Sequence, residues 1–447
     1  MNAAERHVSV GLVLILAAAC QSSPPAATVE PTPTASPTAA VTAGTTLPPT
    51  LSPSVTPTTL PTTPPTIPPT SPPTLAPTPP PLVIDWNKRA GDGGFGSLWD
   101  DTEHPTLHSG VVFAHRFFVV GSESDEFEDE IPAIWSSADG LTWDRANVPS
   151  PGRFSDLVAG PGALVAVGDP YQEDTPLWRT TDGVGWQRKT NDFGSQRISA
   201  ASATDEGFVA FGSALWTSPD GLAWMETPSD SGLALAALGV RKIVRAGDRL
   251  VALAGGAAGA GGPISVWTST NLVEWTHVAD LDHSRNITSL VMASGPLGWL
   301  VAGSTEFGDG QVHRMWRSSD GLSWQDVPSP VGTVNDIFVD AVGFIAVGWV
   351  YTGGGCVLEP SEIRGLTWTS LDGQNWTDVA KEDQLHQRID QLFRDGRLLI
   401  GLGLSYSPEE TEYSAGAVWT FRLPPLASSG PGPGPAPTAT PDIGGCG

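Results

Sequence analysis

One nine-residue phrase recurs along the chain, and its spacing limits the folds that the chain can adopt. The phrase begins and ends with Trp and holds Asp-Gly near its centre. The good copies are WSSADGLTW (135–143), WRTTDGVGW (178–186), WTSPDGLAW (216–224), WRSSDGLSW (316–324) and WTSLDGQNW (368–376). A worn copy, WTSTNLVEW (267–275), lacks the Asp-Gly pair. Because successive copies begin 38 to 52 residues apart, we expect one supersecondary unit to be repeated through the body of the protein.

Short apolar runs that end in Gly provide a second repeat signal. They are FFVVG (117–121), ALVAVG (163–168), FVAFG (208–212), LVALAG (250–255), WLVAG (299–303), FIAVG (344–348) and LLIGLG (398–403). Continuous apolar runs of this length are typical of strands that are buried on both faces. The last run precedes Trp419, where the phrase starts but is not completed. Seven such units predict an all-β protein, a seven-bladed β-propeller of four-stranded blades. Six or eight blades, or a β-sandwich with repeats, are the alternatives.

The strands of each unit are named A to D from the centre outward. Strand B is the run ending in Gly, strand C contains the first Trp, and strand D the second. Asp-Gly predicts a two-residue hairpin between C and D, which would place Trp143 opposite Ser136 and turn Trp135 and Trp143 to opposite faces. The seventh unit lacks strand D. Since IDWNKR (84–89) resembles the D segment LTWDR (141–145), we predict that residues 83–89 pair beside Trp419 and close the ring.

The repeated Ser-x-Asp-Gly-x-x-Trp resembles the Asp-box, or BNR repeat, of sialidases and related propellers, shortened by one residue. The resemblance covers the whole body of the chain and implies a structural hairpin on the side away from an active site. The residue types also favour a structural role, because Ser and Asp side chains accept hydrogen bonds from backbone N–H groups in their own turns and Trp adds buried apolar area. The predicted structural aspartates are Asp139, Asp182, Asp220, Asp320 and Asp372.

The two ends of the chain differ in composition from the repeats. Residues 1–20 contain a short apolar run and end in LAAAC, which resembles a bacterial lipoprotein signal peptide with Cys20 as the lipidation site. Ordinary cleavage after Ala19 is the alternative. Residues 21–82 are almost entirely Pro, Thr, Ala and Ser and predict a disordered spacer. The propeller is predicted over 83–424 and a Pro/Gly-rich tail over 425–447. We expect a lipid-anchored protein on the extracytoplasmic side of the cell membrane.

Charge and cysteine content limit the partners. The net charge of -25 argues against nucleic acid, whose phosphates require Lys and Arg, and the lipid anchor is the only membrane contact expected. If Cys20 carries lipid, Cys356 and Cys446 remain as a candidate disulfide pair. No cofactor or metal site is predicted, because His104 and His108 lack a third ligand and the acidic run 123–130 lacks the ligand spacing of a calcium loop.

The candidate ligand site lies on one face of the predicted ring. Alternating strand direction places the D–A and B–C connections on one face (the B–C face) and the A–B and C–D turns on the other (the A–B face). The B–C face carries the longer loops, where function is expected. Arginines recur near the start of strand A at Arg153, Arg197, Arg241, Arg285 and Arg388, and Trp349, Tyr351 and Tyr406 are candidates for an aromatic wall. Converging guanidiniums would bind a carboxylate or another anion; alternatively, each pairs with an Asp or a carbonyl of the next blade.

These features favour a cell-surface binding or scaffold lipoprotein that takes a glycan or a protein on its B–C face. A sialidase-like glycoside hydrolase and an envelope assembly factor without a ligand are the alternatives. The resemblance to sialidases implies a Tyr–Glu pair, for which Tyr406 or Tyr413 would serve, and a Phe-Arg-Ile-Pro element near the start of the catalytic domain. The nearest match, Phe421-Arg422-Leu423-Pro424, lies at the end of the last unit. The sequence therefore leaves enzymatic activity open, favours its absence and assigns no catalytic residue.

Overall fold

The computed structural model describes residues 82–89, 106–124, 130–148, 154–168, 176–189, 193, 197–255, 263–282, 287–305, 312–351, 363–379, 387–406 and 414–425. The chain divides into two compact units, Met1–Pro79 and Pro80–Gly447, and every described residue belongs to the second. The predicted signal peptide, the spacer apart from Leu82, and the three cysteines lie outside the described residues. Within the described ranges, no helix is long and apolar enough to cross a membrane.

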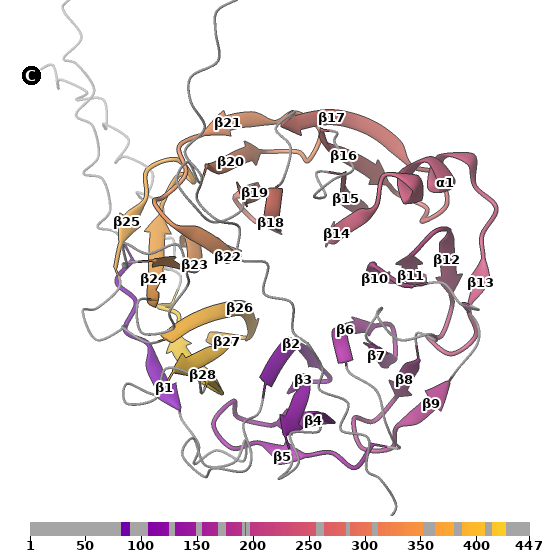
Figure 1. Ribbon diagram of the computed structural model, residues 1–447, viewed down its shortest axis with the longest axis horizontal. Helices are drawn as coiled ribbons and strands as arrows, with labels where there is room; N and C mark the ends of the chain where they lie inside the picture. The colour runs from indigo at the N-terminus through magenta and orange to yellow at the C-terminus, as the bar shows by residue number, and fades with distance from the viewer. Residues whose placement is uncertain are drawn as a thin grey trace, which may run out of the picture. The chain divides into compact units, whose positions relative to one another are not determined.

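Seven four-stranded antiparallel sheets are arranged in a ring (Figure 1) around a central channel. Blade 1 contains β2 (Thr106–Phe113), β3 (Arg116–Ser124), β4 (Glu130–Ser137) and β5 (Asp144–Arg145). Blade 2 contains β6 (Phe154–Gly160), β7 (Ala163–Gly168), β8 (Leu177–Thr180) and β9 (Gln187–Lys189). Blade 3 contains β10 (Ala200–Thr204), β11 (Gly207–Phe211), β12 (Leu215–Ser218) and β13 (Met225–Glu226).

The remaining blades follow the same order, with the first strand of each innermost in the ring (Figure 1). Blade 4 contains β14 (Val240–Ala246), β15 (Arg249–Gly255), β16 (Ile264–Ser269) and β17 (Thr276–Asp282). Blade 5 contains β18 (Ile287–Gly295), β19 (Gly298–Thr305), β20 (His313–Ser318) and β21 (Gln325–Val327). Blade 6 contains β22 (Thr333–Asp340), β23 (Gly343–Tyr351), β24 (Ile363–Ser370) and β25 (Thr377–Asp378).

Blade 7 combines strands from both ends of the described body. It contains β26 (Gln387–Asp395), β27 (Leu398–Tyr406), β28 (Ser414–Arg422) and β1 (Asn87–Arg89). Strand β1 pairs antiparallel with β28, and Lys88 lies opposite Trp419. Just before β1, Ile84 is buried and the Trp86 Nε1 donates a hydrogen bond of 2.9 Å to the Thr367 hydroxyl of blade 6. Residues 82–89 therefore contact both blades 6 and 7.

A short helix that the sequence patterns did not predict, α1 (Asp230–Ala237), connects blades 3 and 4. The Ser229 side chain caps it by accepting from the Gly232 N–H at 2.9 Å, as expected for an N-cap serine. Leu235 is buried in the apolar cluster between blades 3 and 4. The buried Leu235 side chain therefore anchors this connection against blades 3 and 4.

The paired tryptophans pack on the same side of their blade, so the prediction that they face opposite ways was wrong. Ser136 pairs with Asp144, and Trp143 lies in the turn between the two strands. The turn is therefore longer than two residues, which returns the second Trp to the face of the first. Trp135 and Trp143 are both buried against blade 7, in one cluster with Val418. The other good copies likewise place both tryptophans against the preceding blade.

The innermost strands share a β-bulge near the B–C face. In six blades the pairing with the second strand skips one residue: His108, Ser155, Arg241, Thr288, Asn335 and Asp390. A bulge adds one residue and bends the strand. In four blades the backbone carbonyl two residues before the bulge lies close to the Gly that ends the apolar run of strand B: a Cβ at Gly121 or Gly348, for example, would overlap the carbonyl of Thr106 or Thr333. This close approach explains why the apolar runs that end at Gly121, Gly212, Gly348 and Gly403 need Gly there.

Candidate functional site

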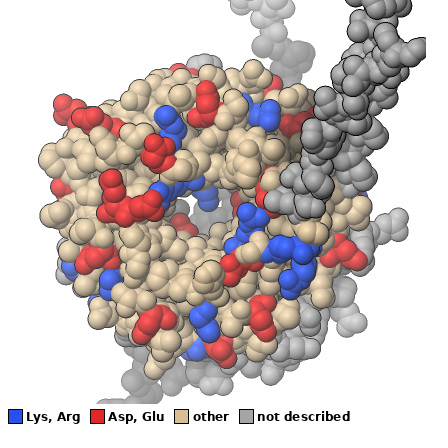
Figure 2. All heavy atoms as spheres, turned by 180° about the vertical axis from the view of Figure 1, so that it is seen from behind, with Lys and Arg blue, Asp and Glu red and all other residues tan. Residues whose placement is uncertain are grey.

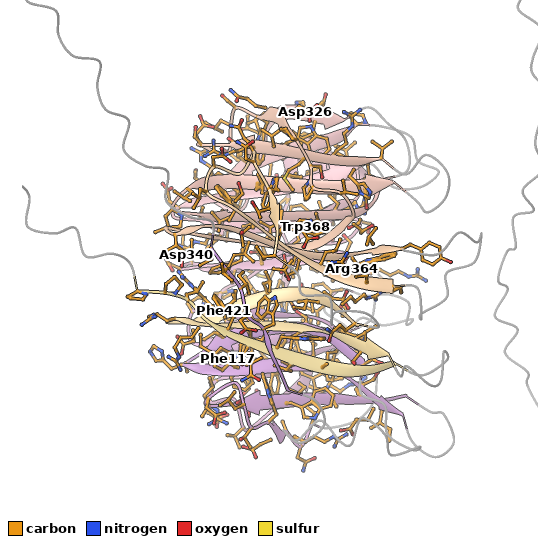
Figure 3. All side chains as sticks on the ribbon, turned by 90° about the vertical axis from the view of Figure 1, so that its left-hand side faces the viewer. Phe117, Asp326, Asp340, Arg364, Trp368 and Phe421 are labelled. Atoms are coloured by element: carbon orange, nitrogen blue, oxygen red, sulfur yellow. The ribbon has the colours of Figure 1, made fainter. Side chains whose placement is uncertain are left out.

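The two faces of the ring are distinct in the side view (Figure 3). Asp340, the last residue of β22, lies on the A–B face, and Arg364, near the start of β24, lies on the B–C face. Most B–C loops lie outside the described residues. The part of the B–C face that the structure describes best is therefore the mouth of the central channel, which the innermost strands surround.

We call the bulged residue of each innermost strand and the residue after it the collar. Its members are His108 and Ser109, Ser155 and Asp156, Ser199 and Ala200, Arg241 and Lys242, Thr288 and Ser289, Asn335 and Asp336, and Asp390 and Gln391. In blade 3, the Ser199 N–H donates to the Phe211 carbonyl, and the next residue, Ala200, also pairs with Phe211. Ser199 therefore takes the bulge position of this blade. Every member except Ala200 is polar. The sequence therefore places a polar layer where the innermost strands meet the channel.

Three of the bulged side chains connect neighbouring blades through the same hydrogen bond. In three blades the bulged side chain reaches the carbonyl of the residue that precedes the bulge in the next blade: His108 Nδ1 lies 2.6 Å from the Phe154 oxygen, Arg241 Nη1 donates to Ile287 at 2.6 Å, and Asn335 Nδ2 donates to Ile389 at 3.0 Å. Ser155 and Ser199 instead donate to carbonyls of their own blades. For His108 the carbonyl can only accept, so Nδ1 carries the proton.

The second collar position makes further contacts between blades. Ser109 donates to Asp156 at 2.7 Å, Ser289 donates to the Val334 carbonyl at 3.1 Å, the Asp336 carboxylate accepts from the Leu392 N–H at 2.7 Å, and the Gln391 side-chain oxygen accepts from the Gly110 N–H at 2.7 Å. The collar thus ties together neighbouring blades at several junctions of the ring.

The Asp336 carboxylate of the collar accepts hydrogen bonds from two backbone N–H groups. Its two oxygens accept from the N–H groups of Ile337, at 2.9 Å, and Leu392, at 2.7 Å. Burial raises the pKa of Asp336, while the charge of Lys242 and the two N–H donors oppose that rise. Asp336 belongs to blade 6 and Lys242 to blade 4, and blade 5 lies between these two blades in the ring (Figure 1).

Asp390 lies in a second charged group, between blades 6 and 7. Its carboxylate is 2.9 Å from Arg388 Nε and accepts from Asn335 Nδ2 at 2.8 Å. Burial raises the pKa of Asp390, and the Arg388 charge opposes the rise. On the opposite, A–B face, Figure 2 shows an opening at the centre of the ring with Lys and Arg side chains and carboxylates around it.

The predicted arginines occupy two different strand positions. Arg197 and Arg388 both precede the apolar residue before the bulge, whereas Arg241 is itself the bulged residue. Arg388 pairs with Asp390, Arg241 bonds to the next blade and has its pKa lowered by burial, and Arg197 has an exposed side chain. Arg153 and Arg285 lie outside the described residues.

The predicted aromatic wall is described only in part. Trp349 is 6 % exposed and Tyr351 is half-buried, both near the end of β23. Tyr406 ends β27, and its side chain lies outside the described part of the structure.

The Phe-Arg-Leu-Pro segment lies at the end of β28. Phe421 and Arg422 are the last residues of this strand, and the Leu423 N–H donates to the Arg397 carbonyl at 2.8 Å. The Phe-Arg-Leu-Pro segment therefore completes blade 7.

The Asp-box side chains cap their own turns on the A–B face. The Asp139 carboxylate accepts from the N–H groups of Leu141, at 2.8 Å, and Thr142, at 2.9 Å, while the Ser137 hydroxyl accepts from the Gly140 N–H at 2.8 Å. The same bonds recur at Asp182, Asp220, Asp320 and Asp372. The N–H donors lower the pKa of Asp139. These carboxylates are occupied by backbone groups of their own turns.

Two arginines that the sequence reasoning missed secure the boxes of neighbouring blades. Arg179 Nε donates to the Asp220 carbonyl of the next blade at 2.7 Å. Arg317 lies over the Phe344 ring at 5.7 Å and beside Gly373 of the next box. The signal was present, since both follow the first Trp of their phrase as Trp-Arg.

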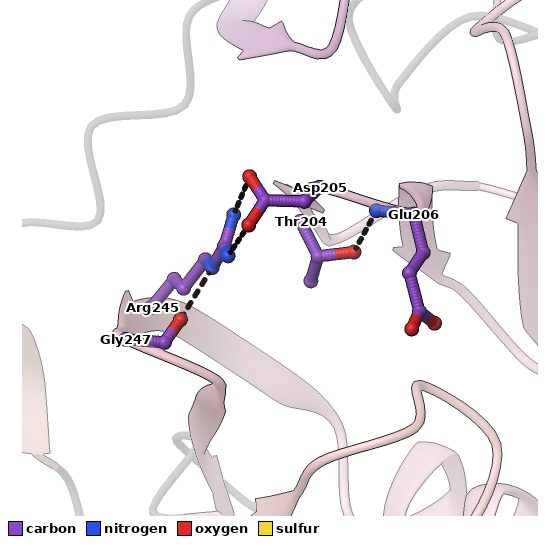
Figure 4. A network of polar contacts seen from close by, with 5 residues as sticks. All are labelled: Thr204, Asp205, Glu206, Arg245 and Gly247. Atoms are coloured by element: carbon purple, nitrogen blue, oxygen red, sulfur yellow. Dashed lines mark hydrogen bonds and ion pairs between the residues drawn. The ribbon is translucent and has the colours of Figure 1, made fainter.

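Ion pairs also link neighbouring blades near the A–B turns. Arg245 of blade 4 forms two hydrogen bonds with Asp205 of blade 3, at 3.0 and 2.6 Å, and a third with the Gly247 carbonyl at 2.7 Å (Figure 4). Arg394 of blade 7 pairs with Asp340 of blade 6 at 2.6 Å. In the described ranges no group of three His, Cys, Asp or Glu side chains is arranged to hold a metal ion.

Comparisons with known proteins are informative at the level of the fold. No protein-family model matches the chain, and no curated protein matches it. Among solved structures, YCF48 bound to D1 peptide is 14% identical, with 77% of this chain and 99% of that chain covered and a TM-score of 0.49. A catalytically inactive virginiamycin B lyase from Staphylococcus aureus is 8% identical, with coverage of 76% and 100% and a TM-score of 0.49.

The endosialidase of phage phi92 is 10% identical, with 79% of this chain and 71% of that chain covered and a TM-score of 0.47. Fold alone does not assign function. The chain is a seven-bladed β-propeller that resembles these proteins in fold.

Proposed function

We propose that the protein is a cell-surface binding scaffold that takes a glycan or another protein on its B–C face, around the mouth of the channel. The observation that carries the proposal is the collar, in which polar side chains join neighbouring blades by hydrogen bonds. Such bonds hold the channel mouth in one geometry, and a rigid mouth loses little entropy when a ligand binds. The exposed Arg197 side chain at this mouth suits an acidic group of the ligand.

The cellular arrangement is part of the same proposal. Cys20 carries the lipid anchor, residues 21–82 form the spacer that holds the propeller away from the membrane, and Cys356 pairs with Cys446. In the propeller, the pairing of β1 with β28 closes the ring.

A thermal-shift screen of the full chain against acidic and neutral sugars, free sialic acid included, tests the binding proposal. A ligand at 100 times its dissociation constant stabilises the folded state by about 2.7 kcal/mol, which raises the melting temperature by roughly 2–4 °C for a domain of this size. The variants are Arg197→Ala, which removes the guanidinium, and Arg197→Lys, which keeps a positive charge.

An acidic sugar that stabilises the wild type but not Arg197→Ala would support a glycan site at the channel mouth. Release of the sugar in a turnover assay would instead support the sialidase-like alternative. If no sugar stabilises the protein, the glycan form of the proposal fails. Failure to capture any protein on the immobilised chain as well would then favour the assembly factor without a ligand.

A further inference from the structure

Helix α1 is apolar on two sides, although the body covers only one of them. The stretch SGLALAALGV (231–240) contains no charged residue. The inner side of α1 packs into the cluster between blades 3 and 4 through Leu235 and Ala236. The outer side consists of four exposed residues, Leu233, Ala234, Ala237 and Leu238. Since a helix that is hydrophobic all round is ordinarily buried all round, the outer side has the composition of a contact surface.

The fold of the protein does not require these exposed leucines. The first turn of α1 is bonded to blade 4, because the Ser229 hydroxyl donates to the Val273 carbonyl and the Ser231 hydroxyl accepts from the Trp275 N–H. These bonds and the buried Leu235 hold α1 at the outer edge of the ring, between blades 3 and 4 (Figure 1). The Leu233 and Leu238 side chains point away from this anchorage and are 46% and 45% exposed.

Acidic side chains lie at the start of α1, and no basic residue lies in its last turn. Glu226 and Asp230 stand on either side of the cap residue Ser229, and both are exposed. Glu274, also exposed, lies between the two residues of blade 4 that bond to the first turn. The C-terminal carbonyls of a helix carry partial negative charge, which no basic side chain of α1 balances. Both ends of the outer side therefore suit cations.

We propose that the outer side of α1 binds an amphipathic helix of another protein, one whose apolar face is flanked by Lys and Arg residues. The apolar face of that helix covers Leu233 and Leu238, in the way that amphipathic helices dock through regularly spaced apolar residues, and its cations meet the acidic side chains. A second copy of this chain would bring the same acidic residues and a net charge of -25 to the contact, and an anionic membrane would be repelled by them.

This surface goes beyond the proposed function, because it lies at the outer edge of the ring and shares no residue with the channel mouth. Leu233→Gln combined with Leu238→Gln removes both apolar side chains and leaves the net charge unchanged. Gln has nearly the helix propensity of Leu, so this leucine variant should melt near the wild-type temperature. The matched control is Val184→Gln combined with Val331→Gln, which changes two apolar residues that are 77% and 78% exposed elsewhere in the ring.

The experiment measures the fluorescence anisotropy of a labelled synthetic helix of Leu and Lys, about five turns long, titrated with the full chain at physiological salt. A second peptide has Glu in place of each Lys. Because any acidic protein attracts basic peptides, the comparison is made between variants of equal net charge. The Lys peptide should bind the wild type at least about tenfold more tightly than the Glu peptide, and the leucine variant should lose at least about tenfold in affinity for it. The valine control and Arg197→Ala should bind the Lys peptide to within about twofold of the wild type.

Equal affinity of the wild type and the leucine variant for the Lys peptide would overturn the proposal, as would equally tight binding of the Glu peptide. If the leucine variant melts at a much lower temperature, Ala237→Arg decides. A cation in the last turn suits the helix dipole, so this variant should stay folded and still repel the Lys peptide. Unchanged binding by a folded Ala237→Arg would then contradict the proposal.

Two further measurements identify the other occupants that this surface could have. Sedimentation velocity of the full chain would reveal a dimer, and a dimer that the leucine variant abolishes would mean that a second copy covers α1. Binding to phosphatidylcholine vesicles that the same variant abolishes would mean that lipid covers it. Either result would overturn the assignment to a basic helix, and neither is expected.

Discussion

Asn271 occupies the place of the box aspartate in the worn copy and shows which property of the aspartate the turn needs. Its side-chain oxygen accepts from the N–H groups of Val273, at 3.2 Å, and Glu274, at 2.8 Å. Asp139 accepts the two equivalent bonds in blade 1. The turn therefore requires an acceptor, and the charge only adds strength and pH dependence.

Replacement of Asp139 separates these two contributions. Asp139→Ala should lower the free energy of unfolding by about 1 kcal/mol, as for loss of a capping side chain, and Asp139→Asn should cost less. The folded pKa of Asp139 lies below the ordinary 3.8, so its charge stabilises the protein above that value and the contribution is lost as the pH falls through the folded pKa.

Melting temperatures between about pH 5 and pH 2 test this pH dependence. The wild type should lose more stability over this range than Asp139→Asn, and Asn271→Asp should lose more than the wild type. Parallel curves for all three proteins would show that the box charges do not contribute.

Leu272 stands where the other boxes have Gly, and it adopts a positive φ of 67°. That conformation costs a Leu about 1–2 kcal/mol, but the side chain is buried between blades 3 and 4, and loss of a buried Leu costs about 2–5 kcal/mol. Leu272→Gly should therefore destabilise the protein by about 2 kcal/mol in chemical denaturation. A more stable variant would mean that backbone strain outweighs packing at this turn.

At the scale of the element, the bulged innermost strand requires Gly at the end of its neighbour. Gly348→Ala should cost about 3 kcal/mol or prevent soluble expression, since overpacking forces the backbone to move and the new Cβ would overlap the Thr333 carbonyl. Gly162→Ala is the control: it meets nothing within 4 Å and bears only the strain of its φ of 71°, about 1 kcal/mol. Equal melting temperatures for the two variants would contradict this role of the bulge.

At the scale of the whole molecule, β1 determines whether the seventh blade is complete. A chain that starts at Pro80 should melt like the full chain, whereas a chain that starts at Gly91 loses β1, buried Ile84 and the Trp86–Thr367 hydrogen bond. Loss of buried Ile84 alone is worth about 2–5 kcal/mol, and the uncovered edge of β28 promotes aggregation. Circular dichroism melts and light scattering measure both effects. Identical melts for the two chains would show that β1 does not close the ring.

From the sequence, the candidate site could be assigned to the B–C face, but the contacts between its side chains could not be predicted. The sequence groups Arg241 with Arg197 and Arg388 near the start of strand A, whereas the structure places Arg241 at the bulge and the other two arginines two residues before it. The hydrogen bonds from Asn335 to Asp390 and from the Leu392 N–H to Asp336 join residues that are far apart in the sequence. No local pattern encodes such contacts.

The sequence by itself determined the number of units, their strand order and the capping role of Asp139 and its equivalents, because each depends on residues within one repeat. The tertiary structure alone decided the direction of the second tryptophans, the bulges and the inter-blade bonds of the collar. Those features depend on how one blade packs against the next, where the Trp143 ring and the Asp336 carboxylate find their partners only after the ring has assembled.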